Sequence, residues 1–217
     1  MTGMDRSDPM IPEPLPPLAR DELADDPVVE FDRWFEVARA RAGYAMPEAA
    51  CLSTVDDEGY PDGRIVLLKA RDARGFVFYT NLRSTKGRAL EARPHASLTF
   101  YWESLARQVR VQGDMERVVD AECDAYFATR PRGSQLGAWA SDQSSVLETR
   151  AALLTRMAEV TVRHEGRPVP RPPHWRGFRL VPRRIEFWQG MPDRLHDRFL
   201  YRRLRQGERW TIERLAP

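Results

Sequence analysis

The chain has 217 residues, of which 42% are hydrophobic and 30% are charged, and its 34 Lys and Arg against 32 Asp and Glu give a formal net charge of +2. This length is enough for the core of one domain, and the proportions are ordinary for a globular protein. So balanced a charge argues against a nucleic-acid binder that depends on contacts to phosphates. No apolar run approaches membrane-spanning length, and the first residues are not a basic segment followed by an apolar one. We therefore expect a cytoplasmic protein that binds neither nucleic acid nor membrane.

The positions of the cysteines and lysines limit the kinds of site that the chain can contain. Cys51 and Cys123 lie far apart in no metal-binding or redox spacing, so we expect reduced structural thiols and no metal site. Lysine occurs only at Lys69 and Lys86, each at the edge of a strand-like segment, in a chain that otherwise uses Arg. An ammonium and a guanidinium are not equivalent at a tight phosphate site, so the two lysines point to anion binding. Chance placement is the alternative.

In chain order, the pattern begins with residues 1–27, which are rich in Pro, Asp and Glu and predict a flexible tail or lid. Residues 28–217 are expected to form a single domain that starts with an amphipathic helix over 29–41. Strands are predicted at 49–55, 64–70, 76–81, 97–102, 108–117, 178–180, 184–189, 199–204 and 209–215, and helices at 84–92, 120–129 and 146–164. Many short strands at this spacing predict a mainly β fold with flanking helices (α+β), in the form of a barrel with the helices outside it.

The strand that runs from Arg64 to Lys69 carries a cation at each end. Side chains alternate along a strand, so these two are predicted to point to opposite faces and could serve two anions. A core strand with charged ends in solvent is the alternative. Further on, Ser84 is a predicted helix N-cap that precedes Lys86, and helix N-termini present free N–H groups to phosphates.

Three side chains in the middle of the chain are candidates for a phosphate clamp. Tyr126 and Arg130 are four residues apart and share one helical face, and Ser134 follows beyond the Pro131 break. Two hydroxyls and a guanidinium that converge would hold a phosphate well. An ordinary helix C-terminus with favourable Arg placement is the alternative. Gln108, in an alternating strand, either bonds the edge of a planar heterocycle or faces water.

The segment 187–199 gathers an indole, an imidazole and two permanent cations at the end of a strand and in the turn after it: Trp188, Arg194, His196 and Arg198. Arg matches phosphate and stacks on flat rings, and His changes protonation near neutral pH, so the set suits an aromatic, anionic ligand. A solvated basic turn beside a core Trp is the alternative. The sequence shows no nucleophile–base pair, metal-ligand spacing or Gly-rich nucleotide loop. The pattern therefore favours a bound organic cofactor that carries out the chemistry while the protein orients it.

Taken together, these motifs resemble the pyridoxine/pyridoxamine 5′-phosphate oxidase family over residues 26–217. The resemblance is carried by the segments 64–69, 78–81, 107–108, 130–139, 143–145, 187–190, 194–199 and 214–217. It implies a Greek-key-like, FMN-binding split β-barrel that works as a homodimer with the flavin at the subunit interface. It also implies oxidation of pyridoxine 5′-phosphate and pyridoxamine 5′-phosphate to pyridoxal 5′-phosphate in vitamin B6 biosynthesis, with O2 as acceptor, giving H2O2 and, from the amine, NH3.

The resemblance also assigns roles by position. The residues it places on FMN are Arg64, Ile65, Val66, Leu67, Leu68, Lys69, Tyr79, Thr80, Lys86, Gln108, Gln143, Ser144, Trp188 and Arg198. Those it places on the substrate phosphate are Lys69, Tyr126, Arg130 and Ser134. Arg194 and His196 would be the catalytic residues, lying over or beside the pyridine ring and orienting it for hydride transfer.

The chain departs from the family pattern at two places. Two rival interpretations of the sequence also remain. Thr85 stands where family members often carry Arg, so one contact to the FMN phosphate is in doubt, and residues 1–27 lack the Tyr that closes over substrate in some members. One rival is a split-barrel flavin or deazaflavin reductase, which shares the fold but not the pyridine clamp. The other is a non-catalytic protein that stores or delivers flavin or pyridoxal phosphate.

Overall fold

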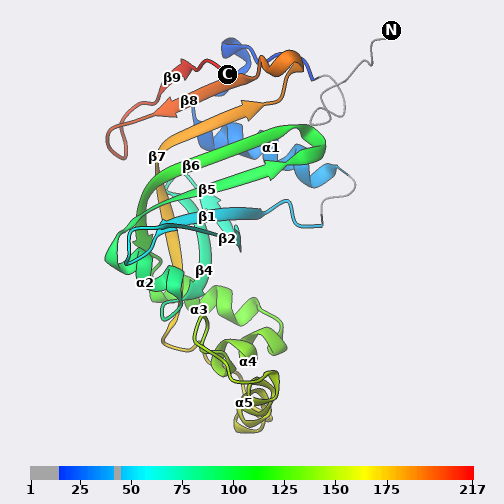
Figure 1. Cartoon of the computed structure of the whole chain (residues 1–217), viewed down its shortest axis with the longest axis vertical. Coiled ribbons are helices and arrows are strands. Elements are labelled where there is room, and N and C mark those ends of the chain that lie inside the picture. Colours follow the sequence, from blue (N-terminus) through cyan, green and yellow to red (C-terminus); the bar gives the residue numbers. More distant parts are fainter. Residues whose placement is uncertain (1–14, 42–44) are drawn as a thin grey trace.

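The computed structural model describes residues 15–41 and 45–217, and within them one nine-stranded antiparallel sheet dominates the molecule (Figure 1). The strands are β1 (Ala49–Val55), β2 (Pro61–Leu67), β3 (Ala70–Asp72), β4 (Gly75–Asn81), β5 (His95–Trp102), β6 (Arg107–Arg117), β7 (Trp175–Gln189), β8 (Asp197–Arg202) and β9 (Thr211–Arg214). The helices are α1 (Pro27–Ala40), α2 (Thr85–Ala92), α3 (Asp120–Thr129), α4 (Arg132–Ala140) and α5 (Arg150–Arg163). The strand order is β2-β1-β5-β6-β7-β4-β3, and β8 and β9 add to the other half of β7. The prediction of a mainly β fold with flanking helices is confirmed.

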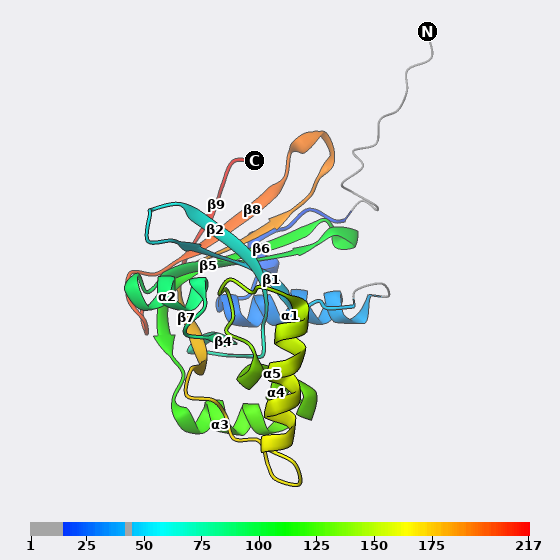
Figure 2. The same ribbon diagram turned by 60° about the horizontal axis from the view of Figure 1, so that its bottom comes forward.

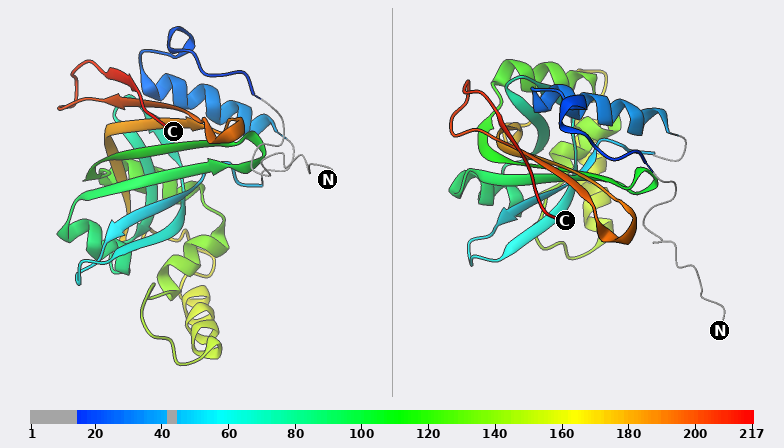
Figure 3. Two further views of the ribbon diagram at one scale, coloured as in Figure 1. Left: turned by 45° about the horizontal axis from the view of Figure 1, so that its top comes forward. Right: turned by 90° about the horizontal axis from the view of Figure 1, so that it is seen from above.

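The long strand β7 makes the sheet curl. Its first half pairs with β4 and its second half with β8, while β6 pairs with it from Phe178 to Gln189 (Figure 3). The register of β6 against β7 shifts between Gln112 and Gly113, opposite Pro182. A bulge tolerates a residue that cannot donate a backbone hydrogen bond. The prediction of two separate strands at 178–180 and 184–189 is therefore wrong, because Pro182 lies inside one continuous, bent strand.

Helix α1 fills the concave side of the curled sheet. Its start is set by Asp26, whose carboxylate accepts a 2.8 Å hydrogen bond from the Val28 N–H, and by Pro27 in the first turn. Phe31 is fully buried, and its ring centroid lies 4.9 Å from that of Phe76 and 5.0 Å from that of Phe100. Edge-to-face packing of this kind fixes the helix on the inner face. No helix of the described residues packs over the middle of the outer face of the sheet (Figure 3).

Helices α3, α4 and α5 extend from one end of the sheet and share a smaller core (Figure 2). Its buried members are Phe127, Leu136, Ala140, Val160, Val169 and Trp175. The sequence-based prediction missed α4, since Pro131 indicated a break. In the structure Pro131 is the N-cap of α4, a position where its missing N–H costs nothing.

The segment before α1 packs against the domain. Leu18 and Leu23 are buried in the main core, the Leu18 N–H donates to the Asp197 carboxylate at 2.9 Å, and the Pro16 carbonyl accepts from Gln189 at 2.8 Å. The expected tail or lid over residues 1–27 otherwise falls on residues 1–14, which lie outside the described part of the chain. Across the described residues, no helix combines the length and apolar character needed to cross a membrane.

Gly87 lies where α2 packs closely against the backbone of the preceding segment. A Cβ added at Gly87 would come within 2.4 Å of the Asn81 carbonyl oxygen and 2.5 Å of the Leu82 carbonyl oxygen, and backbone atoms cannot swing away. Gly87→Ala is therefore expected to cost about 2–3 kcal/mol of folding free energy, or a Tm lower by roughly 5–10 °C. Gly133→Ala is the matched control, because its Cβ would meet nothing within 4 Å. Calorimetry that shows equal Tm values for the two variants would contradict this packing.

Candidate active site

A cavity of about 530 Å³ opens where β2 and β4 meet the helical extension. The predicted cofactor residues that line it are Ile65, Val66, Leu67, Lys69, Tyr79, Thr80, Lys86 and Gln143. The predicted phosphate-clamp residues Lys69, Tyr126, Arg130 and Ser134 line it too. The structure thus brings both groups into one space, although the sequence separates them by a helix and several strands.

The cofactor side of the cavity is cationic. Lys86 Nζ donates to Gln143 Oε1 at 2.9 Å, and Thr80 Oγ1 lies 3.5 Å from the same oxygen. Burial, helped by the nearby Arg64 charge, lowers the pKa of Lys86 below its ordinary value. Ser84 caps α2 as predicted, accepting from the Gly87 N–H at 3.2 Å, so the start of that helix lies beside Lys86. The Lys86 ammonium and the start of a helix suit the phosphate of a cofactor.

The clamp side is built on stacked rings. The ring of Tyr79 lies 4.2 Å from that of Tyr126 and 4.9 Å from that of Trp175, and Arg130 lies 4.9 Å over the Trp175 ring. Arg130 Nη1 is buried and has no hydrogen-bond partner among the described residues. Burial also lowers the pKa of Arg130, and the nearby Tyr126 opposes this shift only in part. A buried N–H without an acceptor is costly, and an anion in the cavity would satisfy it.

Sequence reasoning missed two residues on this side. Trp175 supplies the ring under Arg130, but as the first residue of β7 it gave no periodic signal. Glu48 lies with Oε1 3.9 Å from Lys69 Nζ, because the Leu68 N–H bonds to the Glu48 carbonyl at 2.9 Å and joins the two segments. Such a contact depends on strand pairing and leaves no local pattern. β2 ends at Leu67, so strand alternation does not set the direction of Lys69 either.

A second cluster lies on the outer face of the sheet. Gln108, Trp188 and Arg198 are direct neighbours across β6, β7 and β8. The His196 ring lies 4.7 Å from the Trp188 ring, and its Nδ1 accepts from the Met191 N–H at 3.1 Å. A neutral His196 therefore carries its proton on Nε2.

The turn that carries Arg194 is strained. Asp193 and Arg194 have φ values of 56° and 60°, in the left-handed region that non-glycine residues rarely adopt. Two such residues in a row cost of order 1–3 kcal/mol each and are typical of functional sites. Gln189 and Asp197 pair at the base of the turn, and both are buried. The turn thus presents an exposed Arg194 from a rigid base.

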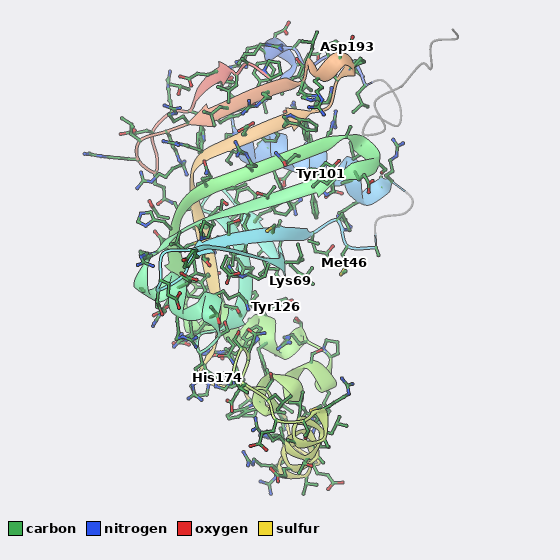
Figure 4. All side chains as sticks on the ribbon, viewed as in Figure 1. Met46, Lys69, Tyr101, Tyr126, His174 and Asp193 are labelled. Atoms are coloured by element: carbon green, nitrogen blue, oxygen red, sulfur yellow. The ribbon has the colours of Figure 1, made fainter. Side chains whose placement is uncertain are left out.

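The two clusters do not meet within one chain. Figure 4 shows Lys69 and Tyr126 beside the helical extension and Asp193 at the opposite end of the sheet. Predicted residues outside the cavity lining are Arg64, Leu68, Gln108, Ser144, Trp188, Arg194, His196 and Arg198. The side chain of Leu68 is buried in the core, so only its backbone is free to contact a ligand. Among the described residues, no group of His, Cys, Asp and Glu could hold a metal ion.

Comparison with known families identifies the family of the chain. Residues 37–164 match the family model of pyridoxamine 5′-phosphate oxidase, and residues 175–217 match the C-terminal dimerisation region of pyridoxine 5′-phosphate oxidase. The chain belongs to the pyridoxamine 5′-phosphate oxidase family. It is therefore an oxidoreductase of that family, and its dimerisation region indicates a homodimer. Family membership also supports FMN as the cofactor.

Relatives of this oxidase family match nearly the whole chain. The pyridoxine/pyridoxamine 5′-phosphate oxidase of Rubrobacter xylanophilus is 56% identical over 92% of this chain and 91% of its own. That of Myxococcus xanthus strain DK1622 is 54% identical over 92% and 96%. Among solved structures, PhzG from Burkholderia lata in complex with tetrahydrophenazine-1-carboxylic acid has a TM-score of 0.81 at 33% identity, covering 92% and 98%. An oxidase-related, FMN-binding protein of Nostoc punctiforme has the same split-barrel fold, with a TM-score of 0.69 at 19% identity over 90% and 100%.

The low pKa of Lys86 predicts how cofactor affinity varies with pH. An ammonium attracts the cofactor phosphate only below its pKa, so FMN affinity should fall as pH rises, with a midpoint below the ordinary lysine value of 10.5. Titration of apoprotein with FMN across this range measures the effect. Lys86→Met should weaken binding at neutral pH and abolish the alkaline step; an unchanged step in that variant would assign it to another group.

Proposed function

We propose that this chain is an FMN-dependent oxidase that converts pyridoxine 5′-phosphate and pyridoxamine 5′-phosphate to pyridoxal 5′-phosphate. For the alcohol, substrate and O2 give pyridoxal 5′-phosphate and H2O2; for the amine, water is also consumed and NH3 released. The observation that carries the proposal is the cavity in which a cationic cofactor side adjoins a clamp with a buried, unpartnered Arg130 N–H. The residues present fit both phosphates that the reaction requires.

The chain's own residues bind and orient. Lys69, Arg130 and Ser134 would hold the substrate phosphate, with the Tyr126 hydroxyl beside them. The ring of the substrate would then lie toward the cofactor side of the same cavity. When bound, FMN supplies the acceptor for the hydride equivalent from C4′, and O2 restores it. Holding the hydride donor and acceptor in contact can lower the activation barrier by on the order of 7–11 kcal/mol.

We further propose that the turn of one protomer completes the cavity of the other. The cavity lacks Trp188, Arg194 and His196, and the turn that carries them lies within the dimerisation region. Exposed Arg194 would supply fixed positive charge where electron density shifts during hydride transfer. His196, with Nε2 free of protein partners in the described residues, would place a ring N–H beside the substrate.

A second candidate follows from the PhzG structure, which holds a reduced phenazine carboxylate rather than a phosphate ester. The 50–56% identity to relatives named as pyridoxine/pyridoxamine 5′-phosphate oxidases, against 33% to PhzG, favours the phosphate ester. Aerobic assays of the FMN-loaded protein separate the two candidates. We expect H2O2 and pyridoxal 5′-phosphate from both B6 phosphates. Turnover of tetrahydrophenazine-1-carboxylic acid alone would support the PhzG-like activity.

The same assay separates the rival interpretations from the sequence. A yellow protein without turnover would indicate storage. Turnover that requires a nicotinamide or deazaflavin donor would indicate a reductase.

The clamp predicts a specific defect for Arg130. Hydrogen bonds to charged groups contribute about 1.5–3 kcal/mol, so Arg130→Ala should raise KM for pyridoxine 5′-phosphate roughly 10- to 100-fold with kcat changed only slightly. Steady-state kinetics measure this. Arg163→Ala, at an exposed position in the last turn of α5, is the control. A lower kcat with an unchanged KM would show that Arg130 does not bind the substrate phosphate.

A further inference from the structure

A buried carboxylate lies next to the outer-face cluster and has no assigned role. Glu186 lies on β7, two residues before Trp188 and on the same face, and is only 5% exposed. Its Oε1 accepts from Arg198 Nε at 2.9 Å, and its Oε2 accepts from Arg110. Burial opposes its ionisation, yet the bonds from Arg198 and Arg110 outweigh burial and lower the pKa of Glu186. A carboxylate this buried is kept charged only by such partners.

The contacts of Arg198 determine which edge of its guanidinium is free. Nε is held by Glu186, and Nη1 donates to the Ala216 carbonyl at 2.7 Å. The described residues leave Nη2 without a partner, and the side chain keeps 26% of its surface exposed. A planar guanidinium anchored at two nitrogens can present the third in only one direction. Arg198 is the neighbour of Trp188 across β7 and β8, so its side chain lies on the same face of the sheet as the outer-face cluster.

We propose that Glu186 is the positioning residue for Arg198, holding its guanidinium so that Nη2 meets FMN; this rests on the proposed function. Glu186 itself does not touch the cofactor. Its two arginines outnumber its one charge, so the network keeps a net positive charge on the face that would meet the cofactor. Without Glu186, Arg198 would retain its charge but lose the bond that fixes Nε.

A purely structural ion pair makes a different prediction. If Glu186 only stabilised the sheet, its loss would lower the Tm of apoprotein and would affect FMN binding in the same way whether or not Arg198 is present. A positioning role instead acts on FMN affinity through Arg198 alone. A double-mutant cycle on FMN binding separates the two.

The experiment titrates apoprotein with FMN and follows flavin fluorescence. We expect Glu186→Gln to raise the Kd roughly tenfold or more, Arg198→Ala to raise it at least as much, and the double variant to match Arg198→Ala. Glu186→Asp, which keeps the charge but shortens the reach, should fall between; it carries the test if the Gln variant does not fold. Glu213→Gln, on β9 with its carboxylate 3.9 Å from Arg202 and half exposed, should bind like wild type.

Three results would overturn the inference, and they can be distinguished from one another. Suppose that the wild-type apoprotein binds FMN. An unchanged Kd in Glu186→Gln would then reject the positioning role alone, and so would additive effects in the double variant. Failure of the wild-type apoprotein to bind FMN would reject the proposed function and this inference with it.

Discussion

Arg194→Ala is expected to lower kcat/KM for pyridoxine 5′-phosphate by about two to three orders of magnitude while FMN content stays close to wild type. The size follows from the loss of a preoriented charge at the reacting ring. Two consecutive left-handed residues hold Arg194 out from the turn, and the buried pair Gln189 and Asp197 holds the turn. The protein thus maintains a strained backbone to present this side chain.

The measurement compares steady-state rates with FMN content per protomer, read from the visible spectrum. Arg205→Ala is the control, since Arg205 is exposed beyond β8 and outside the turn. Loss of FMN and of turnover in equal proportion would assign Arg194 to cofactor retention instead of substrate orientation.

Mixed dimers should recover a kcat/KM for pyridoxine 5′-phosphate that is low in both parent variants. One protomer carrying Arg130→Ala and one carrying Arg194→Ala form one intact site and one doubly damaged site, if cavity and turn come from different chains. Heterodimers isolated with two affinity tags, assayed at substrate concentrations well below KM, should therefore show roughly half of the wild-type kcat/KM. We expect this result because the cavity and the turn that carries Arg194 lie far apart within one chain (Figure 4).

The reciprocal mixture is the control. A chain with both substitutions, paired with a wild-type chain, should keep only a small fraction of the wild-type kcat/KM, because each site then contains one damaged component. If each chain formed its own site, the results would exchange: the first mixture would keep only a small fraction of the wild-type kcat/KM and the second roughly half.

The site was predictable where the chemistry is local. The sequence placed Tyr126 and Arg130 four residues apart on one helical face; in the structure α3 ends at Thr129 with Arg130 as its C-cap, and both residues line the cavity. Ser84 as helix cap and Lys86 beside it follow equally from short-range rules. Trp188 and Arg198 were grouped by proximity in sequence, and the β7–β8 pairing makes them neighbours.

The remaining features depend on contacts between distant segments. Glu48 meets Lys69, and Glu186 joins Arg110 to Arg198, only because strands pair in one register. Pro182 suggested a strand end, but its place opposite a bulge lets β7 continue. The distance between cavity and turn is likewise a property of the curled sheet. The role of each residue toward FMN and substrate rests on the family resemblance and stays a prediction.

The visible spectrum of the FMN-loaded protein, recorded before and after anaerobic addition of pyridoxine 5′-phosphate, tests the central claim most directly. We predict that the flavin absorbance bleaches without any added reductant, and that air restores it with release of pyridoxal 5′-phosphate and H2O2. A flavin band that persists with both pyridoxine 5′-phosphate and pyridoxamine 5′-phosphate would contradict the account.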